Sequence, residues 1–162
     1  MITKFKIYEN FGIELDTEKS EVGVKVLQML SQIQMFHWQV DKIGHHKTFD
    51  EFNEEFKNIA DELIEVIQGK YGRIILNPET YIPLRNIQEL DPYGFAEQCI
   101  EVFKNYKYNF FEKDEEIGTL IDEVIAKLQK LKYLLTFVGW KIKIYDRIIK
   151  NWQDLSHNEM KE

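Results

Sequence analysis

The chain has little cysteine: Cys99 is the only one, so an internal disulfide is excluded. Cys99 lies on an apolar helical stripe, and we expect it to be a small buried hydrophobic residue. There is also no run of about 18 consecutive apolar residues, which a membrane span needs. The first residues, MITKFKIYENFG, contain no apolar block of the signal-peptide kind. These absences predict a soluble, cytoplasmic protein without a membrane partner.

The composition argues against disorder and against a nucleic-acid partner. The 162 residues suit one domain with a single core, spanning residues 1–162. Hydrophobic residues make up 44% of the chain and charged residues 30%, a globular balance. The net charge is −7, and only Lys4 and Lys6 precede Glu9, so few phosphate contacts are available. We therefore predict no strong binding to nucleic acid.

Apolar residues recur at helical spacing along most of the chain. In the clearest stretch the apolar positions are Phe49, Phe52, Phe56, Ile59, Leu63 and Ile67, followed by Gly69 and Gly72 as stop signals. Asp91 before Pro92 is typical of a helix start. The pattern predicts four helices, over residues 18–40, 47–68, 92–111 and 115–137.

The long connection in the middle of the chain indicates the topology. Residues 70–91 include Pro78 and Pro83 and have no regular period, so they can run from one end of a bundle to the other. Two helical hairpins joined in this way predict an all-α, ferritin-like four-helix bundle. Residues 140–155 predict an extra C-terminal helical segment, although Lys141–Ile144 also alternate as a strand would.

The usual metal motif of such bundles is missing. A di-iron site within one bundle uses Glu-x-x-His pairs, and the chain contains none. The nearest sequence, Asp154-Leu-Ser-His157, lies in the polar tail. Any metal site must therefore be built from other residues.

The 47–68 helix offers a set of acids instead. At about 100° per residue, Asp50, Glu54, Asp61 and Glu65 fall opposite the phenylalanine stripe. Asp61 and Glu65 are four residues apart and repel one another unless a cation lies between them. Spacing alone also fits a solvated acidic face. Likewise His37 fits a core or interface histidine, and His45 and His46 fit turn residues.

Taken together, these residues resemble the signature of the Dps proteins, the starvation-induced mini-ferritins. His37 is followed by Trp38; His46 precedes Asp50 by four residues and Asp61 by fifteen, and Asp61 precedes Glu65 by four. These spacings look like those of the family, whereas His37 and His46 are nine apart where the family has a longer loop. The continuation QGKYG is also similar to small tailed-phage proteins of unassigned function, which would place the chain in a host cytoplasm.

The resemblance implies a function and a partner. Asp61 and Glu65 would hold and bridge iron, and His37, His46 and Asp50 would complete the ligand set of a di-iron ferroxidase site. In such proteins the site lies between two subunits, so we expect a homo-oligomer, at least a dimer, formed through the 18–40 and 47–68 helices. The alternative is a catalytically silent helical bundle with an interaction or structural role, including one in a phage.

Overall fold

The computed structural model describes residues 17–76 and 79–137, and this part of the chain contains four α-helices and no strand. They are α1 (Thr17–Gln39), α2 (Ile43–Tyr71), α3 (Pro92–Asn109) and α4 (Glu115–Phe137). The expectation of an all-helical bundle is confirmed for these residues. The C-terminal segment expected at residues 140–155 lies outside the described part.

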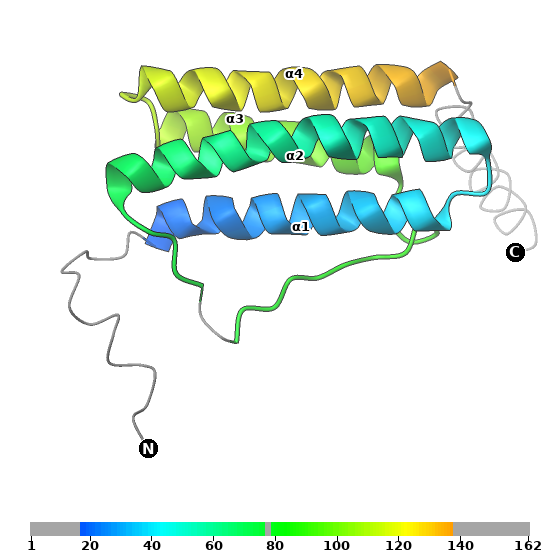
Figure 1. The fold of residues 1–162 in the computed structure, drawn as a ribbon, viewed down its shortest axis with the longest axis horizontal. Helices are drawn as coiled ribbons and strands as arrows, with labels where there is room; N and C mark the ends of the chain where they lie inside the picture. The colour runs from blue at the N-terminus through cyan, green and yellow to red at the C-terminus, as the bar shows by residue number, and fades with distance from the viewer. Residues whose placement is uncertain (1–16, 77–78, 138–162) are drawn as a thin grey trace, which may run out of the picture.

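The helices form two antiparallel hairpins (Figure 1). After α2 the chain returns along the length of α1 before α3 begins, so α2 and α3 run in the same direction. Helix α2 packs on both α1 and α4, while α3 packs mainly on α4 and touches α1 only slightly. The connection at residues 72–91 therefore crosses from one end of the bundle to the other.

The core is built from one apolar stripe of each helix. Along α2 the buried apolar residues are Phe49, Phe52, Phe56, Ala60, Leu63 and Ile67, whereas Ile59 of the predicted stripe is only partly buried. Cys99 on α3 is fully buried, which confirms its expected role as a small hydrophobic residue. On α1 the buried stripe includes Met29 and Phe36, whereas Leu30, and Val40 just after the helix, are only partly buried.

Helix α2 begins four residues before the expected start at residue 47. The residue before it, Lys42, has an extended backbone and makes no side-chain cap hydrogen bond. Without a Ser, Thr, Asp or Asn cap, the sequence carries no signal of this start. His45 and His46 consequently lie within the first turn of α2. At the other end the helix continues through Gly69 and ends at Tyr71, and the next residue, Gly72, has a φ of 94° that suits glycine.

Three glutamines of α1 hold the crossover against the bundle. Gln32, which is buried, accepts a hydrogen bond from the Arg85 backbone N–H (2.9 Å) and donates one to the Arg85 carbonyl (2.7 Å). Gln39 accepts from the Ile87 N–H (2.8 Å), and Gln28 donates to the Pro83 carbonyl (3.1 Å). These side chains satisfy backbone groups that have no helix or sheet partner.

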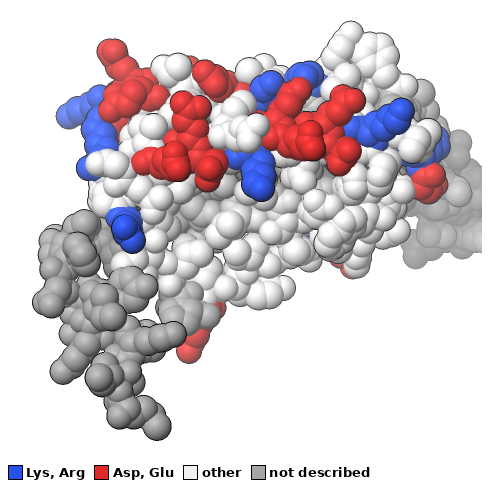
Figure 2. Space-filling view, in the orientation of Figure 1, with Lys and Arg blue, Asp and Glu red and all other residues white. Residues whose placement is uncertain are grey.

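Charge is distributed unevenly over the surface. Figure 2 shows Asp and Glu side chains gathered over α2, with some Lys and Arg side chains among them, while the surface over α1 below it is almost free of charge. The sequence agrees, because no Asp, Glu, Lys or Arg occurs from Val26 to Val40. One hairpin thus presents an acidic strip beside an uncharged one.

Candidate functional site

His37 and His46 lie together at the turn between α1 and α2. Their ring centroids are 3.9 Å apart and the ring planes are inclined by 33°. His37 belongs to the last turn of α1 and is half-buried, and His46 belongs to the first turn of α2 and is exposed. The short connection of Val40, Asp41 and Lys42 therefore brings the two imidazoles into contact rather than separating them.

The tautomer of His46 follows from its hydrogen bond. Its Nδ1 lies 3.2 Å from the backbone carbonyl of His37, and a carbonyl oxygen can only accept, so Nδ1 carries the proton. The last helical bond of α1 runs from Val40 N to Phe36 O (3.1 Å), which leaves the His37 carbonyl for this contact. In neutral His46 the other nitrogen, Nε2, keeps its lone pair, the arrangement typical of metal-binding histidines.

The second imidazole also has an unused nitrogen. The Nδ1 atom of His37 is buried and has no hydrogen-bond partner among the described residues. Buried polar atoms without a partner are uncommon in native proteins. The third histidine of this region, His45, is also buried, but it points to the core side of α2 rather than to the surface.

The three candidate carboxylates of α2 are exposed, and they lie at two different distances from the histidines. Asp50 is one turn after His46. Asp61 is fifteen residues after His46 on the same helix, which is about 22 Å along the helix axis at 1.5 Å per residue. Asp50, Asp61 and Glu65 make no hydrogen bond or ion pair with the described residues. One copy of the chain thus brings His37, His46 and Asp50 to one end and leaves Asp61 and Glu65 far from them. No group of three or more metal-ligating side chains occurs within the described part.

The opposite end of α2 carries a polar cluster that the sequence did not reveal. The buried carboxylate of Asp114 accepts a hydrogen bond from the Tyr71 hydroxyl and pairs with the Lys70 ammonium. Lys70 also pairs with Glu116 at 2.6 Å, and the Lys19 ammonium lies 4.3 Å from the Tyr71 ring centroid. The residues come from three separate segments, so no spacing in the sequence could connect them.

Mutual hydrogen bonding shifts the titration of this cluster. Lys70 and then Tyr71 hold the pKa of the Asp114 carboxyl below its ordinary value. The hydrogen bond to Asp114 raises the pKa of Tyr71, and the same carboxylate raises the pKa of Lys70. The ionised form of Asp114 and the protonated forms of Lys70 and Tyr71 therefore stabilise one another.

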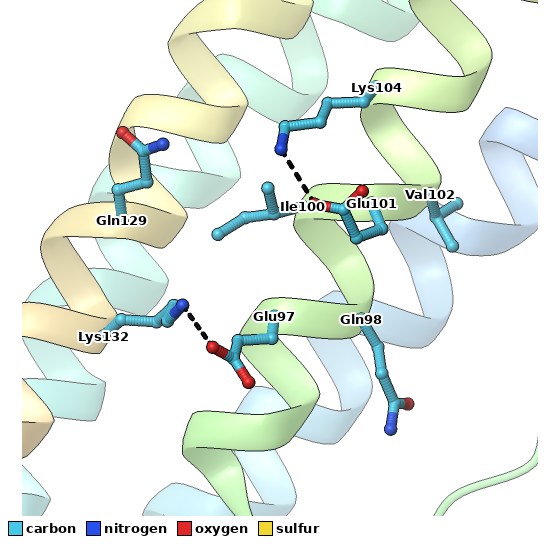
Figure 3. A pocket seen from close by; sticks show the side chains of 8 residues that line it. All are labelled: Glu97, Gln98, Ile100, Glu101, Val102, Lys104, Gln129 and Lys132. Carbon is cyan, nitrogen blue, oxygen red and sulfur yellow. Dashed lines mark hydrogen bonds and ion pairs between the residues drawn. The ribbon is translucent and has the colours of Figure 1, made fainter.

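A shallow groove of about 780 Å³ follows the outer side of α3 and α4 (Figure 3). Its charged side chains are joined in pairs, Glu97 with Lys132 at 2.7 Å and Glu101 with Lys104 at 2.8 Å. Paired surface charges of this kind contribute little stability, and they leave no reactive group directed into the groove.

The fold and the site define an all-helical bundle with a histidine pair at one end of its first hairpin. Residues 37–135 match a protein family described as a family of unknown function (DUF5856), and the chain belongs to that family. The match begins at His37 and includes both the histidine pair and the acids of α2. No curated protein and no solved structure matches the chain. Within the described residues, no helix is both long and apolar enough to cross a membrane.

Proposed function

We propose that the chain is a ferritin-like bundle that binds and oxidises Fe(II) at a Dps-type site shared by two copies. The helix directions support this reading, because two antiparallel hairpins joined by one long crossover are typical of ferritin-like bundles. Iron is proposed as the metal because a pattern of this chain resembles that of the mini-ferritins. The pattern consists of His37-Trp38, His46, Asp50, Asp61 and Glu65.

The contact between His37 and His46 is the observation that carries the proposal. The two rings lie 3.9 Å apart at 33°, and with Nδ1 of His46 donating to a carbonyl, Nε2 of neutral His46 is the nitrogen that can donate its lone pair to a metal. Imidazole and carboxylate together suit Fe(II) and contain no thiolate that would favour softer metals. These donors fit iron, which when bound would supply the electron-transfer chemistry.

The separation of the ligands along α2 is consistent with a twofold site. If two copies of α2 lie antiparallel with His46 level with Glu65 of the partner subunit, then Asp50 is level with Asp61 of the partner subunit. The same register places Glu54 level with Lys57 of the partner subunit, an attractive pair beside the axis. All six positions follow helical spacing on one exposed face of α2, so one antiparallel register aligns all three pairs. A twofold contact would also generate two equivalent sites.

The neighbouring surface of α1 suits such a contact. A hollow of about 480 Å³ lies beside the α2 face and is lined by Leu30, Ser31, Gln34, Met35, Trp38, Asn53, Lys57 and Leu84. Trp38 is 69% exposed, and α1 carries no charge around it. Large exposed aromatic residues are enriched at protein interfaces. Asp61 and Glu65 would then hold the metal from one copy, and His37, His46 and Asp50 would complete its ligands from the other.

The proposal is tested by anaerobic Fe(II) titration with calorimetry, together with light scattering. We expect stoichiometric Fe(II) binding to a species at least twice the 19.5 kDa chain mass, followed by oxidation when oxygen is admitted. Asp61→Ala should abolish the binding. Glu62→Ala is the matched control, because Glu62 is an exposed acid on the same turn outside the proposed face. Equal binding by both variants, or a monomer that binds no iron, would overturn the proposal.

The second candidate function is that of a catalytically silent bundle with an interaction or structural role, including one in a phage. The exposed Trp38 and the uncharged surface of α1 favour it, since a binding surface needs no metal. This reading predicts no stoichiometric Fe(II) binding and no effect of Asp61→Ala on any association.

A further inference from the structure

One face of α1 carries both a hollow and an exposed leucine. The hollow of about 480 Å³ beside the α2 face is lined on the α1 side by residues that include Ser31, Gln34, Met35 and Trp38. The last three lie three, four and seven residues after Ser31, and four positions at this spacing form the hole of a knobs-into-holes contact between helices. Leu27 lies one turn before Ser31 on the same face and is 42% exposed.

The leucine and the hollow are placed symmetrically about Ser31. Leu27 lies four residues before Ser31, and Met35, which lines the hollow, lies four residues after it. If two α1 helices run antiparallel and cross at Ser31, Leu27 of each copy is level with Met35 of the partner subunit and therefore faces the hollow. Serine is small, so the two helices can approach closely at the crossing.

We propose that α1 packs antiparallel on α1 of a second copy, with Leu27 of each copy seated in the hollow of the other. We call this contact the α1 seam. A second copy is the favoured occupant because each copy supplies both a knob and a hole on one face, as a twofold interface requires. No charged residue occurs from Val26 to Val40, so two chains of net charge −7 can meet there without opposing like charges.

The α2 register of the proposed function puts the twofold axis at the same level. The pairing of His46 with Glu65 of the partner subunit places the axis midway between these positions, two to three residues after Asn53. Asn53 donates a hydrogen bond to Gln34 of α1 at 2.9 Å, so these two residues are level. Because α1 runs opposite to α2, the axis passes α1 two to three residues before Gln34, next to Ser31. The α1 seam rests on the proposed function for this agreement, but it requires no metal.

The seam is tested on the full-length, metal-free protein by analytical ultracentrifugation. Leu27→Asp would place a charge in the hollow, so we expect a dimer dissociation constant at least about tenfold higher than that of the native chain. Leu27 lies outside the core, so far-UV circular dichroism should show an unchanged helix content. Tyr108→Asp is the matched control, because it introduces the same charge at an exposed side chain in the last turn of α3 and should leave the constant unchanged. Equal constants for the native chain and Leu27→Asp would overturn the proposal. So would a monomeric native chain, because the surface would then serve a different partner.

A disulfide tests the register. Ser31→Cys should give a covalent dimer on oxidation with diamide, because the axis brings the two introduced thiols together. The native chain should give none, since Cys99 is fully buried. Thr119→Cys, at an exposed position of α4, controls for random collision. Equal cross-linking of the two cysteine variants would contradict the α1 seam.

Iron binding separates this inference from the proposed function. If Leu27→Asp dimerises as well as the native chain and both bind Fe(II) stoichiometrically, the α1 seam is wrong and the proposed function stands. If Ser31→Cys cross-links and Leu27→Asp is monomeric, but the native dimer binds no Fe(II), the α1 seam stands and the proposed function is wrong.

Discussion

The two ends of α2 carry polar clusters of opposite kinds. At its C-terminal end, Lys70 and Tyr71 are tied to Asp114, and each polar group has a partner within the chain. At its N-terminal end, His37 keeps a buried nitrogen without a partner among the described residues, and Asp50 is exposed and unpaired there. A closed cluster stabilises the fold, whereas an open one retains binding capacity for something outside the chain.

The strongest way to break the closed cluster is to remove Asp114. Asp114→Ala should lower the free energy of unfolding by about 2–3 kcal/mol, because it takes the charged partner from Lys70 and the acceptor from Tyr71. Urea unfolding followed by circular dichroism measures this loss. Glu115→Ala, at the exposed neighbouring position, is the control and should change stability by less than about 0.5 kcal/mol.

The contribution of the Asp114 cluster to stability should depend on pH. The folded-state pKa of Asp114 lies below its ordinary value of 3.8, so its stabilising effect is full above pH 3.8 and is lost as the pH falls through the lowered value. We expect the free energy of unfolding to decrease below about pH 4 and the decrease to be smaller in Asp114→Asn. Some of it should remain, because Lys127 and Lys130 also lower the pKa of Glu55. An identical pH profile for the variant would contradict this assignment.

The open end should tolerate substitution better. His46→Ala removes one hydrogen bond to the His37 carbonyl from an exposed position, so we expect a loss of only about 0.5–1 kcal/mol in unfolding free energy. If that end binds metal, the same variant loses Fe(II) affinity while keeping its fold, which separates binding from stability. A stability loss as large as that of Asp114→Ala would show that the two ends are equivalent after all.

The smallest effect is expected with DNA. The acidic strip on α2 repels phosphates, and several lysines, among them Lys127, Lys130 and Lys132, are already paired with acids. We predict no mobility shift of duplex DNA at physiological salt, a condition under which a few phosphate contacts give only weak binding. A clear shift would contradict the prediction.

Much of the fold could be predicted because each helix carries a local signal. The phenylalanine stripe predicted α2, and Asp91 before Pro92 predicted the start of α3. At that start the Asp91 carboxylate accepts a hydrogen bond from the Gly94 N–H at 2.7 Å. The start of α2 could not be placed, because Lys42 provides no cap. The candidate residues were found through their spacing on α2, whereas their exposure and lack of partners depend on which faces the other helices cover.

By itself, the sequence determined the helical periods and the place of the long crossover, because the first follows from side-chain spacing along a helix and the second from the lack of such spacing. Only the tertiary structure decided that His37 and His46 meet, that Gln32 holds Arg85, and that Asp114 closes on Lys70 and Tyr71. These contacts join segments whose relative positions are set by how the apolar stripes pack. Side-chain spacing within one helix carries no information about that packing.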